Sequence, residues 1–292
     1  MMRFRKLGGA LGAEVTGLNL QTPLGRCEAD QLTKEWFRHG VLVFRGQMIT
    51  DEEHVRFARR FGRLETFTQP NGIASFVPEI FCSANTDESG RLLPSDDERI
   101  KMLRLNWLWH IDSSYRAMPV KGVVLRALHV AEEGGDTIFA DNVAAFEALP
   151  GTIKTRIEGL RAIHNFAYLV RQQGGDLRPE EVASLPRAEH PLVRRHADGR
   201  RSLYLSPPYM EKIVGWSEAD SCALLHELMA WATQERFLFR HRWQLHDVIM
   251  WDNAWTMHCV TPYDVARHRR VVHGVTILGE EPVLPMKAIP QP

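Results

Sequence analysis

Two residues near the middle of the chain have the types and the spacing to hold a metal ion. His110 and Asp112 are separated by a single residue. In a β-strand, side chains two positions apart point to the same face of the sheet. One imidazole and one carboxylate on one face form two-thirds of a 2-His-1-carboxylate facial triad, which leaves three coordination positions open. Such a site suits chemistry with a chelating cosubstrate and O₂, although the short sequence motif alone is a weak signal.

His258 is the expected third ligand. It lies in the second of two apolar stretches, residues 249–251 and 256–260, which flank a polar turn at Asp252-Asn253, as expected for two paired strands. We expect the fold to bring it from this distant pair of strands to the first two ligands. Two structural alternatives remain open: a hydrogen-bonded surface pair at 110 and 112, and a core histidine at 258. Three other histidines are expected to be structural, namely His129, His164 and His273.

Arg270 opens an apolar stretch, residues 270–278, that has the character of a strand. A guanidinium that points inward from a strand is costly unless it meets an anion. Its planar fork matches a carboxylate bidentately, although a structural salt bridge is an alternative because the chain has 36 acidic residues. A metal with open positions beside a carboxylate clamp is what 2-oxoglutarate requires, since its 2-oxo acid chelates the metal and its distal carboxylate needs a cation.

The elements that would position these residues are mostly strands in the second half of the chain. Alternating and apolar stretches predict strands at 41–44, 122–130, 137–140, 237–240, 247–251, 256–260 and 270–278. Helices are predicted after Thr50, at 141–149 and at 217–233, whereas residues 63–105 are expected to be mostly loop. This pattern favours an antiparallel β-sandwich wrapped by helices. The chain has no GxGxxG or GxxxxGK[ST] motif, so Rossmann and P-loop folds have no support.

Composition limits the classes of function. Basic and acidic residues number 36 each, which argues against a nucleic-acid binder that works by bulk charge. The four cysteines form no CxxC pair, so we expect buried free thiols rather than a zinc ribbon or a disulfide scaffold. With 292 residues, no signal-like segment and no apolar run of membrane-spanning length, we expect one domain over 1–292, a cytoplasmic location and no membrane partner.

At these residues the sequence resembles the taurine/2,4-dichlorophenoxyacetate (TauD/TfdA) family of Fe(II)/2-oxoglutarate-dependent dioxygenases. The resemblance covers roughly residues 8–280. Each landmark is short, but their order and spacing together are specific. The landmarks are residues 41–45, 57–62, 109–114, 134–137, 144–149, 251–253, His258 and Arg270.

The family resemblance implies a fold and a set of roles. The fold would be mainly β with flanking helices (α+β), around a double-stranded β-helix, the cupin-like jelly roll. A long insert between Asp112 and His258 would carry an active-site lid at about 168–190. His110, Asp112 and His258 match the Fe(II) ligands. Thr137 and Arg270 match the residues that bind the distal carboxylate of 2-oxoglutarate, and Asn106 matches a polar position beside substrate and cosubstrate.

The same resemblance implies an activity. Oxidative decarboxylation of 2-oxoglutarate by O₂, giving succinate and CO₂, would be coupled to hydroxylation of a small organic substrate. A carboxylate at position 112 favours hydroxylation over halogenation. Two alternatives stay open: a non-catalytic sensor of 2-oxoglutarate or metal on the same fold, and the same triad holding another divalent metal. Members of the family form dimers or tetramers, and nothing in the sequence decides between them.

The sequence departs from the family at two positions that bear on the substrate. Taurine and phenoxyacid members carry an arginine where this chain has Gly274. Many relatives have a second arginine after Asn253, where this chain has Ala254 and then Trp255. We therefore expect a substrate other than taurine, larger or less charged, in a pocket that includes Ser113, Trp255 and Gly274. The sequence does not choose among four candidate partners for a substrate anion, which are Arg104, Arg116, Lys121 and Arg171.

Overall fold

A seven-stranded sheet forms the main layer of the protein. The computed structural model describes residues 2–9, 11–67 and 77–283. Every strand pair in this sheet is antiparallel except the parallel pair β2–β3. The strand order is β1 (Arg3–Lys6), β2 (Ala13–Thr16), β3 (Val41–Phe44), β13 (Val248–Asp252), β5 (Gly122–His129), β15 (Val271–Ile277) and β4 (Ile80–Ala84).

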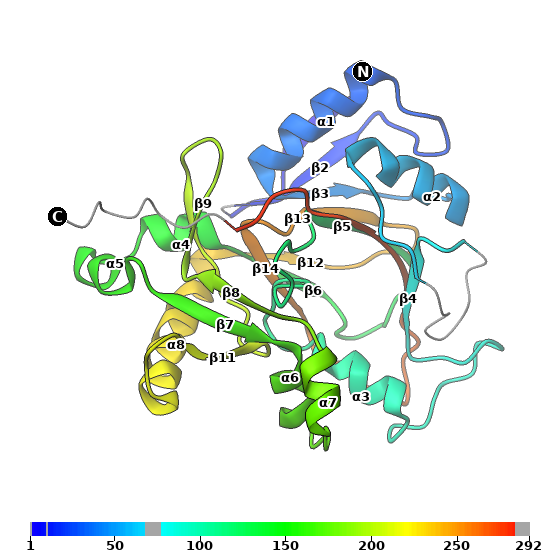
Figure 1. The fold of residues 1–292 in the computed structure, drawn as a ribbon. Helices are drawn as coiled ribbons and strands as arrows, with labels where there is room; N and C mark the ends of the chain where they lie inside the picture. The colour runs from blue at the N-terminus through cyan, green and yellow to red at the C-terminus, as the bar shows by residue number, and fades with distance from the viewer. Residues whose placement is uncertain (1, 10, 68–76, 284–292) are drawn as a thin grey trace.

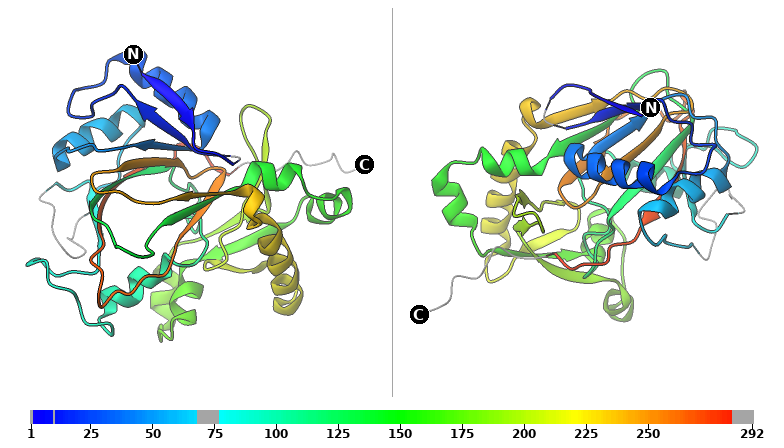
Figure 2. Two further views of the ribbon diagram at one scale, coloured as in Figure 1. Left: turned by 180° about the vertical axis from the view of Figure 1, so that it is seen from behind. Right: turned by 90° about the horizontal axis from the view of Figure 1, so that it is seen from above.

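The seven-stranded sheet separates two apolar layers, because its strands alternate side chains between the two faces. In β3, Leu42 and Phe44 pack in the layer that also holds residues of α1 (Arg26–His39) and α2 (Asp51–Ala58). Val41 and Val43 pack on the opposite face, in the layer that contains Phe139. Figures 1 and 2 show α1 and α2 on the outer side of the sheet. The inner layer is the one that reaches the metal-site residues.

A second sheet faces this inner layer. It consists of β12 (Leu238–His241), β6 (Thr137–Asp141) and β14 (Thr256–Val260), all antiparallel. Phe139 of β6 packs on Trp251 of β13, with ring centroids 5.7 Å apart. The two sheets therefore enclose a shared core, and β14 carries His258 along its edge.

The segment between β6 and β12 builds a further layer of helices and short strands, visible in green and yellow in Figure 1. Its apolar core is formed largely by the helices and strands of this segment together with Ile111. Its strands are β7 (Arg161–Asn165), β8 (Arg187–Pro191), β9 (Val193–Arg195), β10 (Arg201–Leu203) and β11 (Met210–Ile213). Its helices are α4 (Asn142–Glu147), α5 (Gly151–Ile157), α6 (Phe166–Gln172), α7 (Pro179–Ser184) and α8 (Glu218–Ala232).

The predicted α+β class, mainly β with flanking helices, is confirmed. Thr50 and Ser217 cap α2 and α8, since each side chain accepts a hydrogen bond from the backbone N–H three residues on. The prediction of mostly loop over 63–105 is wrong in two places, at β4 and at α3 (Glu98–Leu105). Asp97 caps α3 by accepting from the Arg99 N–H. Part of that interval, 68–76, lies outside the described residues.

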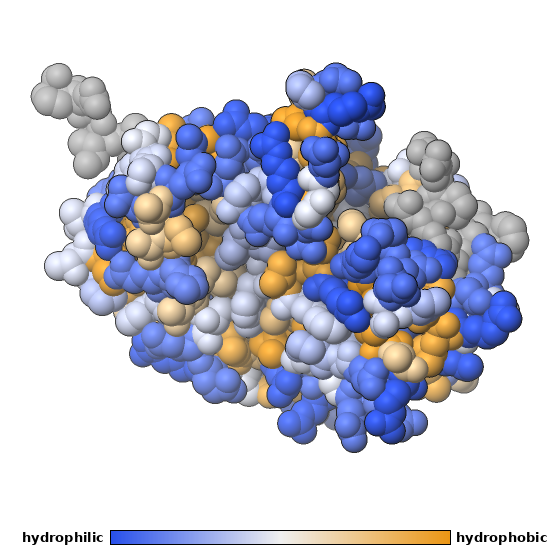
Figure 3. Space-filling view, turned by 90° about the horizontal axis from the view of Figure 1, so that it is seen from below, coloured by the Kyte–Doolittle hydropathy of each residue, from blue (hydrophilic) through white to orange (hydrophobic). Residues whose placement is uncertain are grey.

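All four cysteines are free, as expected, but Cys27 and Cys222 are exposed rather than buried. Both lie on helices, α1 and α8, and face solvent there. On the face in Figure 3, hydrophobic side chains form separate patches among hydrophilic ones. Within the described ranges, no helix is long and apolar enough to cross a membrane.

Candidate active site

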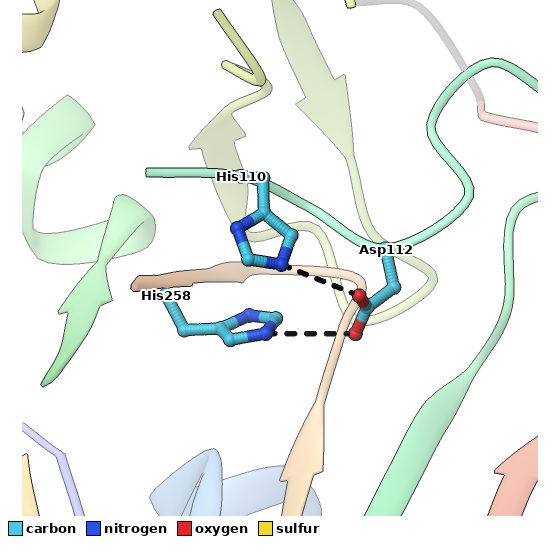
Figure 4. Close-up of side chains that lie close together, drawn as sticks. All are labelled: His110, Asp112 and His258. Carbon is cyan, nitrogen blue, oxygen red and sulfur yellow. Dashed lines mark ion pairs between the residues drawn. The ribbon is translucent and has the colours of Figure 1, made fainter. Parts of the chain in front are cut away.

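His110, Asp112 and His258 converge, as the sequence predicts. Their ligand atoms all lie within 4.8 Å of one another. Nε2 of His110 is 3.6 Å from Oδ1 of Asp112, and Nε2 of His258 is 3.7 Å from Oδ2 (Figure 4). These separations are too long for hydrogen bonds but suit three ligands around one cation. Among the described residues this is the one group of three or more such side chains close enough to hold a metal ion.

The pKa values of His258 and Asp112 favour their metal-binding forms. Burial and the neighbouring His110 lower the pKa of His258 to about 3, so its imidazole is neutral. Burial raises the pKa of Asp112, but the two imidazoles outweigh this and lower it overall, so the group is a carboxylate. Although burial opposes it, the neighbouring Asp112 carboxylate raises the pKa of His110, so a metal would replace a proton there. His110 Nδ1 lies 2.7 Å from the Leu108 carbonyl, to which it donates. That hydrogen bond sets the tautomer and leaves the Nε2 lone pair free for a metal.

The backbone of residues 110–112 is held without a regular strand, which corrects the sequence-based expectation. His110 makes only an isolated antiparallel bridge with His258, with N···O distances of 2.9 Å in both directions. The Ser206 hydroxyl accepts from the Ile111 N–H at 3.0 Å, and the Asn253 carboxamide exchanges two hydrogen bonds of 2.9 Å with the Asp112 backbone. Hydrogen bonds from the side chains of Ser206 and Asn253 thus take the place of pairing with a neighbouring strand. Ile111 between the ligands is fully buried.

Asn253 should affect metal affinity through this hydrogen-bonded pair, although it contacts no metal-facing atom. Its amide also donates to the Val120 carbonyl at 3.0 Å, and the side chain is fully buried. We expect Asn253→Ala to weaken Mn(II) or Fe(II) binding by roughly 10–100-fold, because Asp112 would lose the contacts that orient it. Isothermal titration calorimetry would measure this loss.

The matched control for this prediction is Asn19→Ala. Asn19 also hydrogen-bonds through its side chain to a nearby backbone N–H, that of Gln21, but on the surface and away from the cavity. Unchanged metal affinity in Asn253→Ala, with a folded protein, would contradict the positioning role.

Arg270 lies in the same cavity as the triad and is buried, with 4% of its surface exposed. It precedes β15 directly rather than belonging to it. Nε donates to the Gly135 carbonyl at 3.0 Å, and no ion pair of Arg270 is found within the described residues. Nη2 is buried with no hydrogen-bond partner there. Burial lowers the pKa of the guanidinium, and Tyr263 and Asp136 only partly offset this.

The surroundings of Arg270 fix its position. Asn85, which is fully buried, accepts from the Arg270 N–H at 2.8 Å. Gly135 has φ +69°, and a Cβ there would lie 3.1 Å from Cδ of Arg270, so a glycine allows the side chain to pass. A pre-positioned buried cation with a free N–H group is a binding site for an anion.

Thr137 and Asn106 also line this cavity, as the family resemblance implies. The indole Nε1–H of Trp243 donates to Oγ1 of Thr137 at 3.0 Å. No acceptor for the Thr137 hydroxyl proton is found in the described part of the chain, so the hydroxyl is free to donate into the cavity. Asn106 is the C-cap of α3, and its carbonyl accepts from the Val260 N–H at 2.7 Å. No sequence pattern indicated Trp243, Ser206 or Asn253 as positioning residues.

Of the three predicted substrate-pocket residues, only Ser113 lines the cavity. Ser113 has φ +54°, a left-handed conformation that bends the chain directly after Asp112. Trp255 does not line this cavity: it is buried in the inner core against Gly40. Gly274 faces the inner layer, but the Phe81 ring lies over it, so Gly274 itself does not line the cavity either.

The four candidate anion partners separate clearly in the structure. Only Arg116 lines the cavity. Lys121 donates to the Phe61 carbonyl at 2.9 Å, Arg104 lies over the Trp107 ring, and Arg171 is exposed on α6. No residue of the predicted lid, 168–190, lines the cavity; its nearest link is His190, whose Nε2 lies 2.9 Å from the Arg116 carbonyl. The lid role therefore stays a prediction.

Comparisons with known proteins find similar sequences along most of the chain. Residues 3–276 match the family model described as "Taurine catabolism dioxygenase TauD, TfdA family". The chain is 34% identical to the α-ketoglutarate-dependent 2,4-dichlorophenoxyacetate dioxygenase of Cupriavidus pinatubonensis, over 91% of this chain and 94% of that protein. It is 33% identical to the (S)-phenoxypropionate/α-ketoglutarate dioxygenase of Sphingobium herbicidovorans, over 92% of each chain.

A solved structure is similar along almost the whole chain. AAD-2, crystallised with Mn(II) and N-oxalylglycine, superposes with a TM-score of 0.88 and 34% sequence identity, over 98% of this chain and 100% of that chain. Identity and coverage at this level, together with the family match, fix the membership. The chain belongs to the TauD/TfdA family of dioxygenases.

Proposed function

We propose that the chain is an Fe(II)- and 2-oxoglutarate-dependent dioxygenase that hydroxylates a small organic substrate other than taurine. His110, Asp112 and His258 hold the iron, and Arg270 and Thr137 bind the distal carboxylate of 2-oxoglutarate. The observation that carries the proposal is the buried, unpaired guanidinium of Arg270 in the cavity that the triad lines. The relatives named for α-ketoglutarate-dependent activity support it.

The metal assignment is supported by the donor set. Two imidazoles and one carboxylate form the facial triad typical of non-haem Fe(II) oxygenases. Oδ2 of Asp112 is buried without a hydrogen-bond partner in the described part of the chain, as expected of an atom that meets a cation. When bound there, Fe(II) supplies open coordination positions for the 2-oxo acid and O₂. Mn(II) in the AAD-2 structure is a metal of similar charge and ligand preference.

The cosubstrate assignment rests on charge and on hydrogen-bond donors. A carboxylate beside Arg270 neutralises a buried cation and accepts from its free Nη2 and from the Thr137 hydroxyl. N-oxalylglycine, present in the AAD-2 crystal, is an amide analogue of 2-oxoglutarate with the same two carboxylates and a carbonyl beside one of them. The balanced reaction converts substrate, 2-oxoglutarate and O₂ to hydroxylated substrate, succinate and CO₂.

The protein's own residues bind and orient the reactants rather than transfer protons. Apolar side chains of the inner layer, including Val123, Leu125 and Val272, line the cavity and exclude water from it. The carboxylate clamp places the cosubstrate, which fixes where its 2-oxo acid lies relative to the triad. Asn106 is proposed to contact cosubstrate or substrate as a polar group at the edge of the cavity.

The two sheets that enclose the site support a double-stranded β-helix, or jelly-roll, core for this chain.

Two further expectations accompany the function. A cytoplasmic location and a dimeric or tetrameric assembly remain predictions. Size-exclusion chromatography with light scattering would measure the assembly.

Trp243 should control how well Thr137 binds the cosubstrate. Because its indole occupies the acceptor side of the Thr137 hydroxyl, the proton is left to point at the carboxylate. We expect Trp243→Phe to raise KM for 2-oxoglutarate about 2–10-fold, the equivalent of one hydrogen bond, with little change in kcat.

The control is the same change in a Thr137→Val background, where the indole has no hydroxyl to orient. There Trp243→Phe should have no further effect on KM. Equal effects of Trp243→Phe in both backgrounds would rule out this role and leave the tryptophan as a packing residue.

The direct test of the proposed activity is formation of succinate from 2-oxoglutarate. Purified protein supplied with Fe(II), ascorbate and O₂ should release succinate slowly on its own and faster when a substrate is present. Asp112→Ala should abolish both rates. Binding of 2-oxoglutarate without any release of succinate would instead favour the sensor alternative.

A further inference from the structure

In the part of the cavity that the cosubstrate does not need, the charged side chains neutralise each other. The charged side chains that line the cavity, apart from the triad, are Glu65, Arg116 and Arg270. Arg270 belongs to the cosubstrate under the proposed function. The remaining two form an ion pair of 2.7 Å, Arg116 Nη2 to Glu65 Oε1, and therefore cancel each other. Within the described residues, no unpaired cation of the cavity is left for a substrate anion.

The Glu65–Arg116 pair is held at both of its backbones. The Glu65 N–H donates to the Thr276 carbonyl of β15 at 2.9 Å. The Arg116 N–H donates to the Ser113 carbonyl at 2.9 Å, and the Arg116 carbonyl lies 2.9 Å from Nε2 of His190. Their side chains are only 19% and 35% exposed. The pair is thus a built part of the cavity rather than a chance contact of mobile surface side chains.

An aromatic wall lines the cavity on the β4 side. Phe81 of β4 pairs in register with Gly274 of β15, and its ring covers the glycine. A Cβ at Gly274 would lie 2.1 Å from the end of that ring, so the ring occupies the space of a side chain. Phe67 meets Phe81 edge-to-face with centroids 5.8 Å apart. Both rings line the cavity.

The size of the cavity limits the substrate further. Its volume is about 250 Å³, below the roughly 300–1,000 Å³ typical of ligand pockets. Because 2-oxoglutarate would share this space, the cavity encloses only a small part of a substrate beside it. Of the two expectations drawn from the sequence, a larger substrate or a less charged one, the structure supports the second.

We propose that the substrate is a small aromatic molecule whose bound part carries no net charge, and that the Glu65–Arg116 ion pair selects against anionic substrates. The aromatic wall of Phe67 and Phe81 contacts the ring. Glu65 repels a substrate carboxylate and remains paired with Arg116. A neutral polar group, in contrast, hydrogen-bonds to the two side chains without breaking their ion pair. This inference rests on the proposed dioxygenase function and names its substrate class.

Two probes that differ mainly in charge test the inference: 2,4-dichlorophenoxyacetate and its neutral amide, 2,4-dichlorophenoxyacetamide. Each is titrated anaerobically into the Fe(II)- and 2-oxoglutarate-loaded protein, and Kd is read from the change in the visible spectrum. The wild-type protein should bind the amide roughly tenfold more tightly than the acid. Glu65→Gln should improve acid binding roughly five- to tenfold and change amide binding less than about twofold.

Two further variants separate specificity from general damage. Glu79→Gln breaks another glutamate–arginine pair, with Arg59, that does not line the cavity, so both affinities should stay unchanged. Phe81→Leu should weaken both probes by a similar factor, because it removes the aromatic contact and no charge. Succinate release under air would report whether each bound probe is also oxidised.

The outcomes separate this inference from the function on which it rests. No spectral band with 2-oxoglutarate alone would overturn the proposed function itself. A normal band with the acid bound as tightly as the amide, or more tightly, would overturn the inference alone. A normal band that neither probe perturbs at millimolar concentration would also overturn it, because the cavity would then not accept a small aromatic ring.

Discussion

Replacing Arg270 with leucine should weaken 2-oxoglutarate binding severely and leave the folded protein at least as stable as the wild type. The guanidinium is buried, with no ion pair in the described ranges and one buried N–H group unsatisfied. Loss of a buried carboxylate clamp costs about 2–5 kcal/mol, or roughly 30- to several-thousand-fold in Kd. Without the ligand, however, the same cation is a burden on folding. If Arg270 had a structural role instead, its replacement would destabilise the protein and leave 2-oxoglutarate binding unchanged.

The measurement has two parts, a Kd for 2-oxoglutarate by calorimetry with Mn(II) present and a thermal unfolding midpoint of the ligand-free protein. Arg270→Lys keeps the charge but not the fork and should give an intermediate Kd. Arg161→Ala removes a half-exposed arginine, paired with Glu189 away from the cavity, and serves as the control. A large loss of stability in Arg270→Leu with little change in Kd would contradict the clamp.

Replacing His258 with alanine should remove the metal site. The triad offers one ligand atom from each of three residues, so losing one leaves two ligands. Even changes to residues that only orient metal ligands cost 10–100-fold in affinity, and removal of a ligand should exceed about 100-fold. Turnover of 2-oxoglutarate should fall below detection, because chelation of the cosubstrate needs the metal.

Mn(II) binding by calorimetry reports this loss directly, independent of any substrate. His226→Ala is the matched control, because His226 is a histidine exposed on α8 and lines a different cavity. A His258→Ala protein that is folded and binds Mn(II) as the wild type does would show that the three side chains are not the metal site.

Two of the three metal ligands could be predicted because their relation is local. His110 and Asp112 are two residues apart, and any extended backbone places such side chains on one side. The turn at Asp252-Asn253 indicated where the strand with His258 begins, but not its partner. β13 and β14 lie in different sheets, and β14 pairs with β6. The clamping of residues 110–112 by Ser206 and Asn253 could not be predicted. Those contacts depend on how remote segments fold back, and no periodicity encodes them.

The fold was predictable where elements have a strong apolar pattern or a cap, as in β3, β14 and α8. It was not predictable in residues 63–105, where glycine, proline and polar residues resemble a loop. β4 lies at the edge of its sheet, so its burial is mostly partial and its pattern is weak. The cap at Asp97 was the signal that could have identified α3.

The substrate pocket was the least predictable part. Trp255 was expected there from its position after Asn253, but the reversal of the chain at 253–255 turns it into the core. Gly274 was expected there because it stands where relatives carry an arginine, but the residue across the strand pair, Phe81, fills the space beside it. Sequence position indicates which strand a residue occupies, whereas the neighbouring strand decides what lines the cavity.

Anaerobic titration of 2-oxoglutarate into the Fe(II)-loaded protein tests the central claim most directly. Chelation by a 2-oxo acid at the triad should produce a weak metal-to-ligand charge-transfer band in the visible spectrum. The band should be lost in His258→Ala and should need far more cosubstrate in Arg270→Leu. A wild-type protein that binds Fe(II) but shows neither this band nor any binding of 2-oxoglutarate would contradict the account.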